Sequence, residues 1–186
     1  MGEGGLASRA SEPGWRGSSH SSSPGSRLLH RGGTVLLRGS FDYTLDAKNR
    51  LTVPAKVRHH FAEGAVLARG LTRNVSLWIP AEFDAYSTDM LSGFDPLDED
   101  YATLDSHLVG GSHDVELDSA GRIAMPSRLA QYAGITKDVV LVGSKTHIQI
   151  WDRSTWDARS ERLPDAVQDI SRRRKGASRL PTLGQA

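Results

Sequence analysis

One motif occurs twice in this chain, and the duplication limits the folds that the sequence can adopt. Residues 46–58 read DAKNRLTVPAKVR, and residues 118–130 read DSAGRIAMPSRLA. Each copy contains Asp, three residues, Arg, an alternating apolar pair and then Pro, at a spacing of 118 − 46 = 72 residues. Repetition in register indicates two structural units of one kind that bury a shared core.

The segments that follow the motif recur in the same order. The matched pairs are VLARG at 66–70 with VVLVG at 139–143, SLWI at 76–79 with IQIW at 148–151, and Phe83 with Trp156. Each copy then has about four short strands, which are too few to bury both faces of a sheet alone. We therefore expect the two copies to pack or exchange strands, closing one β-barrel from two halves.

Each motif is predicted to form a tight turn between two strands. Phe41, Tyr43 and Leu45 alternate with polar residues before the first turn, as in a half-buried strand. Asn49 stands where Gly121 stands in the second copy, and both residue types readily adopt a positive φ. The side chains of Asp46 and Asp118 are expected to accept hydrogen bonds from the backbone of their own turns.

The predicted fold class is α+β, mainly β, with two tandem repeats and short flanking helices. In the region between the copies we expect one helix, with Asp95 as N-cap, Pro96 at its first position and Gly110 near its end. The Gly-, Ser-, Arg- and Pro-rich start of the chain has the composition of a disordered segment. The expected parts are a disordered extension at 1–34, repeat 1 at 39–84, the linking helix at 85–113, repeat 2 at 114–157 and a flexible tail at 164–186.

Charge is distributed unevenly along a chain whose formal net charge is only +1. Between Arg73 and Arg122 there is no Lys or Arg, while eleven Asp and Glu lie in that interval. The first copy of the motif is basic, because residues 38–58 contain five Lys and Arg against two Asp. A nucleic-acid surface is therefore expected on the first copy.

Four cations of the first copy are the candidate DNA contacts. Arginine offers both a charge for phosphate and a planar donor pair for base edges. Lys48 and Arg50 are expected at the tip of a hairpin that enters a major groove, with Arg38 and Arg58 on phosphates beside it. The alternative is that Arg50 pairs with Asp46, and Arg122 with Asp118, only to fix the turns; for Arg122 this structural role is the favoured one.

Other patterns exclude several classes of site. The chain has no Cys, so disulfides and thiolate metal sites are excluded. The seven His show no metal-ligand spacing, and no Gly-rich phosphate loop precedes a helix. Ser112, His113 and Asp114 are consecutive and would not converge as a hydrolase triad. We therefore expect no catalytic residue, metal or cofactor, and no membrane span.

The quoted motifs resemble those of the MraZ family. The resemblance covers residues 35 to about 163, through RGSFDYTLDAKNRLTVPAKVR at 38–58 and LVGGSHDVELDSAGRIAMPSRLAQYAGITKDVVLVG at 108–143. It implies a double AbrB-like, swapped-hairpin fold and a DNA-binding transcriptional regulator of a bacterial division and cell-wall gene cluster. It also implies assembly into rings and repression of the protein's own operon through repeated promoter boxes.

The leading interpretation is a cytoplasmic, nucleoid-associated homo-oligomer that binds tandem promoter repeats in double-stranded DNA, gaining affinity through multivalency. The alternative is a ring-forming scaffold or an antitoxin-like protein-binding module. The basic run RRRK at 172–175 would add nonspecific attraction to DNA or, as the favoured interpretation, form a solvated helix end or tail.

Overall fold

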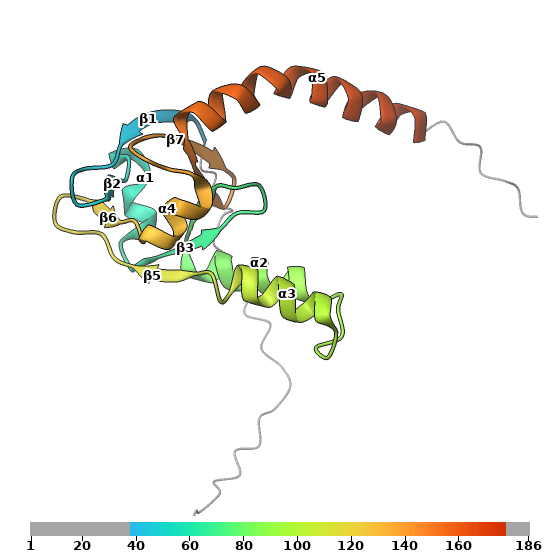
Figure 1. Ribbon diagram of the computed structural model, residues 1–186, viewed down its shortest axis with the longest axis horizontal. Coiled ribbons are helices and arrows are strands. Elements are labelled where there is room, and N and C mark those ends of the chain that lie inside the picture. Colours follow the sequence, from blue (N-terminus) through green and yellow to red (C-terminus); the bar gives the residue numbers. More distant parts are fainter. Residues whose placement is uncertain (1–37, 178–186) are drawn as a thin grey trace, which may run out of the picture. The chain divides into compact units, whose positions relative to one another are not determined.

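The structure is a computed structural model that describes residues 38–177 (Figure 1). Residues 1–37 and 178–186 lie outside the described residues, so the expected disorder at 1–34 lies outside them too. The first copy consists of β1 (Ser40–Thr44), β2 (Arg50–Thr52), α1 (Ala55–Arg58), η1 (His59–Phe61), β3 (Ala65–Arg69), β4 (Val75–Trp78) and α2 (Pro80–Leu91).

The second copy repeats this order after a separate helix, α3 (Glu99–Leu108). Its elements are β5 (His113–Val115), β6 (Arg122–Ala124), α4 (Ser127–Ala133), β7 (Asp138–Ser144), β8 (His147–Asp152) and α5 (Arg153–Ala177). The α+β class and the two repeats are thereby confirmed.

The two copies exchange strands. Six strands form an antiparallel sheet in the order β1-β7-β8-β4-β3-β5, and β2 pairs with β6 in a separate ribbon. Thus β1 of the first copy pairs with β7 of the second, and β5 of the second with β3 of the first. If each strand is replaced by its equivalent in the other copy, the same strand order results, read from the opposite edge of the sheet. This symmetry indicates an internal pseudo-twofold axis that relates the two copies.

The hydrogen-bond ladders do not close into a barrel within the described residues. Strand β1 pairs only with β7, and β5 only with β3, so these two strands are the edges of the sheet. Strands β2 and β6 do not join the edges, because their backbone groups pair with each other at Leu51 and Ile123. The expected closed barrel is therefore not seen; the structure is a large antiparallel sheet with a two-stranded ribbon.

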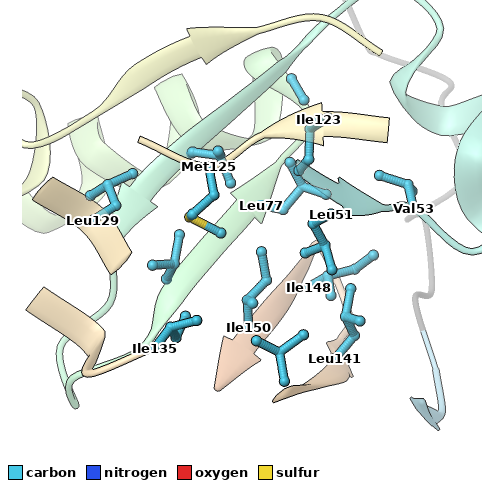
Figure 2. Packing of buried hydrophobic residues seen from close by; sticks show 14 of the residues in the cluster. Leu51, Val53, Leu77, Ile123, Met125, Leu129, Ile135, Leu141, Ile148 and Ile150 are labelled. Atoms are coloured by element: carbon cyan, nitrogen blue, oxygen red, sulfur yellow. The ribbon is translucent and has the colours of Figure 1, made fainter. Parts of the chain in front are cut away.

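One hydrophobic core is shared by both copies (Figure 2). Its fully buried residues include Leu51 and Leu77 from the first copy and Ile123, Leu141 and Ile150 from the second. Neither copy contributes a complete core, since facing side chains come from different repeats. Burying one Leu or Ile side chain at such a position stabilises the folded state by about 1.5–3 kcal/mol.

The linking region differs from its prediction. Helix α2 runs to Leu91, and α3 begins at Glu99 with Asp98 as its N-cap, so the region contains more than one helix. The carboxylate of Asp95 accepts a hydrogen bond from the Leu97 N–H at 2.9 Å and closes a turn ahead of the helix. An Asp followed by Pro fits such a turn as well as it fits an N-cap, which is why the pattern alone was ambiguous.

Helix α5 extends beyond the predicted end of regular structure. It continues through Pro164 to Ala177, so residues 164–177, which were expected in a flexible tail, are helical. Every described side chain from 164 to 174 is exposed. None of the helices in the described part of the chain combines the length and apolar character needed to cross a bilayer.

Candidate nucleic-acid interface

The two motif turns have the same backbone hydrogen bonds. In the first turn the Asp46 Oδ1 atom accepts from the N–H groups of Lys48 and Arg50, each at 2.9 Å. The Asp46 backbone also bonds Asn49 and Arg50, both at 2.9 Å. Asn49 has φ 54°, the left-handed conformation that Asn tolerates better than most residues.

The second turn reproduces this geometry. The Asp118 Oδ1 atom accepts from the N–H groups of Ala120 at 2.9 Å and Arg122 at 3.0 Å. Gly121 has φ 73°, matching Asn49. In each turn the Asp is therefore bonded to the backbone of its own loop, and the residue with positive φ lies just before the Arg.

Strand exchange links each turn to the other copy. The Asn49 carbonyl accepts from the Met125 N–H at 2.8 Å, and the Gly121 carbonyl accepts from the Val53 N–H at 3.0 Å. Each turn thus caps the end of the other copy's ribbon strand. The two turns cannot move independently without breaking these bonds.

Four charged side chains join the turns into one cluster. The Arg50 Nε donates to Asp46 Oδ2 at 2.8 Å, and the Arg122 Nε donates to Asp118 Oδ2 at 2.9 Å. Two longer contacts cross the twofold, Arg50 Nη1 to Asp118 Oδ2 at 3.4 Å and Arg122 Nη1 to Asp46 Oδ2 at 3.7 Å. We call Asp46, Arg50, Asp118 and Arg122 the turn cluster.

The turn cluster alters the ionisation of its members. The hydrogen bonds from the Arg50 side chain and then its backbone lower the pKa of Asp46 from 3.8 to about 2. The side-chain hydrogen bond from Arg122 likewise lowers the pKa of Asp118, and the same bond raises the pKa of Arg122. Asp46, Asp118 and Arg122 are therefore charged at neutral pH.

The predicted DNA contacts lie in different environments. Arg38 and Lys48 are exposed, and Lys48 is at the tip of the first turn. Arg50 is partly buried in the turn cluster. The Arg58 guanidinium, on α1, donates to the Val53 carbonyl of its own copy at 3.0 Å. It also lies directly against Gly121 in the turn of the other copy.

The structure also adds features that no local pattern predicted. The cross-copy bond between Arg50 and Asp118 joins residues 68 positions apart. The contact between Arg58 and the second turn places a cation of the first copy beside the turn of the acidic half. A groove beside this turn is lined by Arg58, His59 and Ser119. In the sequence, only the repeat could have indicated these contacts. Two repeats can exchange strands, and the exchange brings the helix of one copy to the turn of the other.

The division of the chain into two repeats agrees with a comparison against protein families. The family model described as "MraZ protein, putative antitoxin-like" matches residues 36–102 and 108–176, one stretch for each copy. The chain belongs to the MraZ family. The resemblance in the motif residues is thus confirmed over both repeats.

Several MraZ relatives carry the name "Transcriptional regulator MraZ". The protein of Symbiobacterium thermophilum is 35% identical over 133 residues, covering 72% of this chain and 96% of the relative. That of Micrococcus luteus is 37% identical over 64% of this chain and 82% of its own length, and that of Dictyoglomus turgidum is 33% identical over 72% and 92%. These names describe regulators, a class of proteins that are not enzymes, in agreement with the prediction that this MraZ chain is not an enzyme.

Proposed function

We propose that this MraZ protein is a DNA-binding transcriptional regulator whose first motif turn enters a DNA groove. The observation that carries the proposal is a rigid pair of turns with an exposed cation, Lys48, at the tip of one of them. The relatives named as transcriptional regulators support the same function. A pre-formed turn loses little conformational entropy when it binds, so its few contacts retain their affinity.

The four candidate cations have different parts in this proposal. Lys48 and Arg38, being exposed, contact phosphates. Arg50 is oriented by Asp46, and its Nη1, whose bond to Asp118 is long at 3.4 Å, is the donor most easily redirected to DNA. Arg58 supports the second turn and adds positive charge beside it.

The regulatory role that we propose follows the family resemblance. The protein acts in the cytoplasm at the nucleoid and represses its own division and cell-wall gene cluster. It binds tandem promoter repeats as a homo-oligomer that makes several turn contacts at once, so that individually weak contacts add up to useful affinity.

A binding experiment separates this function from its rival. The promoter region upstream of the chain's own gene is compared with a scrambled sequence of equal length at about 0.15 M salt, where nonspecific attraction to phosphates is moderate. The regulator binds its promoter more tightly than the scrambled DNA. Equal affinity for both favours the second candidate, a ring-forming scaffold or antitoxin-like module, which the family description "antitoxin-like" supports.

The same assay tests the turn. Replacing Lys48 by Asn removes one phosphate contact for each turn engaged, so the slope of log affinity against log salt becomes shallower by about 0.9 per lost contact. Lys145→Asn is the matched control, because Lys145 is an exposed cation on the turn between β7 and β8. Equal effects of the two substitutions contradict the assignment of the first turn.

A further inference from the structure

A cavity of about 260 Å³ lies on the outer face of the six-stranded sheet, between the sheet and α2. The inner face packs into the shared core through residues such as Leu77. Ser76 and Trp78, its neighbours on β4, point to the outer face, because successive side chains of a strand alternate. Helix α2 adds Phe83 and Tyr86 to the lining. Among the described residues, no member of the turn cluster lines this cavity, so it is separate from the proposed DNA surface.

Aromatic rings form one wall of the cavity. Trp78 stacks on Tyr86 with ring centres 4.7 Å apart and on His147 with ring centres 4.0 Å apart. Phe83 approaches the Trp78 ring edge-on at 6.1 Å. Burial lowers the pKa of His147 from 6.5 to about 4, so its imidazole is neutral at pH 7. The wall therefore consists of uncharged rings, which suit a planar aromatic ligand.

The fold does not require a ring at Tyr86. The second copy has Arg159 at the equivalent place, since 159 − 86 = 73, and Trp151 is equivalent to Trp78, since 151 − 78 = 73. The Arg159 guanidinium lies over the Trp151 ring, 5.0 Å from its centre. Either side chain can thus cover the tryptophan. The complete aromatic wall is a feature of the first copy and not of the repeat.

Hydrogen-bonding groups in the cavity have weak or missing partners. Asn74 is 2% exposed, and the bonds of its Nδ2 are long, 3.4 Å to Ser76 Oγ and 3.5 Å to a backbone carbonyl. Gln149 Oε1 accepts from Trp151 Nε1 at 3.0 Å, which leaves the Gln149 Nε2 as a donor for a ligand. His147 Nδ1 is buried and has no hydrogen-bond partner among the described residues. A ligand that supplies the missing partners is stabilised by these groups.

The cavity offers no counter-charge to an ionised ligand. Arg69 is the one charged residue among the described residues that line it. The Arg69 guanidinium lies over the ring of Tyr132, 5.6 Å from its centre. Tyr132 belongs to α4 and packs against the shared core, on the other side of the sheet from α2. An uncharged ligand is therefore favoured over an anion or a cation, since a buried charge needs a partner.

We propose that the cavity binds a small, planar, uncharged heterocycle with both donors and acceptors on its edge, which is the chemistry of a nucleobase. The ring lies against the aromatic wall of Trp78, Tyr86 and His147. The carboxamides of Asn74 and Gln149 bond the polar edge, as these side-chain types do with the edges of bases. This inference goes beyond the proposed function and does not depend on DNA binding by the motif turns.

Fluorinated free bases test the cavity in the full-length chain. The probes are 5-fluorouracil, 5-fluorocytosine and 2-fluoroadenine, and binding is followed by the broadening of their fluorine NMR signals. At least one base binds saturably, with a Kd of about 1 mM or tighter, and about tenfold more tightly than fluorobenzene. Fluorobenzene is the matched probe because it has the ring without the polar edge. Absence of saturable binding, or equal affinity for fluorobenzene, overturns the proposal.

Two substitutions locate the binding. Gln149→Glu keeps an oxygen that accepts from Trp151 but replaces the free donor by an acceptor, and it lowers the affinity for the base about tenfold or more. Tyr86→Arg introduces the residue type that the second copy has at this place, so the fold accommodates it while the ring is lost, and the affinity falls likewise. Gln168→Glu, the same change at an exposed position of α5, retains the wild-type affinity. Unchanged affinity in either cavity variant, with a wild-type circular dichroism spectrum, overturns the site.

Two further measurements identify the source of the base and separate the cavity from the DNA surface. Excess oligothymidine displaces the bound probe if the cavity takes a base from a single strand, and leaves it bound if the cavity takes free bases. Lys48→Asn retains the affinity for the base, because Lys48 is on the motif turn and does not line the cavity. A loss of base binding in Lys48→Asn would place the probe at the turn and overturn the cavity assignment, whereas the promoter assay tests the regulatory function independently.

Discussion

At the scale of single residues, the two carboxylate oxygens of the motif Asp have different hydrogen-bond partners. Asp46 Oδ1 accepts from the turn backbone, while Oδ2 accepts from Arg50 and lies near Arg122. Asn would retain only one oxygen and would carry no charge to hold the guanidinium. The Asp-x-x-x-Arg spacing is therefore explained by turn geometry before any DNA is considered.

The ionisation of Asp46 predicts how acid affects stability. Its pKa is lowered from 3.8 to about 2 by the hydrogen bonds from Arg50, so the folded state holds the proton less tightly than the unfolded state. The resulting stabilisation is complete above about pH 4 and is lost as the pH falls towards 2. In Asp46→Asn, the free energy of unfolding, measured by urea titration at several pH values, depends less steeply on pH in that window.

Asp118→Asn provides the comparison for this prediction. The pKa of Asp118 is lowered by the equivalent bonds from Arg122, so Asp118→Asn also makes the free energy of unfolding depend less steeply on pH on the acid side of the profile. A profile for Asp46→Asn that runs parallel to that of the wild type between pH 4 and 2 would contradict the proposed origin of the shift.

At the scale of elements, each motif turn packs against residues of the other copy. A Cβ atom at Gly121 would overlap the Arg58 guanidinium, and the φ of 73° disfavours side chains in any case. Arg58 is in turn held by the Val53 carbonyl. The glycine therefore serves both its own turn and the close approach of a helix from the first copy.

This close approach predicts a coupled pair of substitutions. Gly121→Ala lowers the free energy of unfolding by about 1 kcal/mol or more through backbone strain, and by a further amount through displacement of Arg58. In the double variant with Arg58→Ala the displacement is absent, so the two losses are less than additive in a urea-denaturation cycle. Strict additivity would show that the Arg58 contact contributes nothing.

The turns were predictable from sequence because their determinants are local. Asp46 and Asn49 lie within five residues of each other in the first turn, and Asp118 and Gly121 do so in the second. The alternation of Phe41 and Tyr43 with polar residues marks the strand that leads into the first turn. Strand partners were not predictable in this way. The residues near β1 in the sequence do not indicate that β1 pairs with β7 rather than with β2. The bond from Arg50 to Asp118 in the other copy depends on this exchange of strands.

The candidate DNA residues show the same limit. The sequence identified the basic first copy correctly as a feature of composition, but it placed Arg58 with the first turn, whereas the exchange of strands brings it against Gly121 in the second. Where a charged side chain points depends on tertiary contacts that charge patterning does not contain. The assignment of Arg38, Lys48, Arg50 and Arg58 to DNA stays a prediction.

At the scale of the whole molecule, the exchange makes each repeat incomplete by itself. The first copy lacks β7 for its edge strand β1, and the second lacks β3 for β5. The ribbon needs one strand from each copy, and its central pair, Leu51 with Ile123, is fully buried. Folding of the two repeats should therefore be a single cooperative event.

Dividing the chain in the turn between α2 and α3 tests this directly. Neither fragment, residues 1–93 or 94–186, can satisfy its edge and ribbon strands alone, so each gives no cooperative thermal transition by circular dichroism. An equal mixture regains the strand signal and one sharp transition, because β1, β2, β5 and β6 find their partners across the cut. The intact chain melts in one step that coincides for circular dichroism and Trp fluorescence. A fragment that melts cooperatively alone, at a concentration where it is monomeric, would mean that a repeat can close its own core without strand exchange.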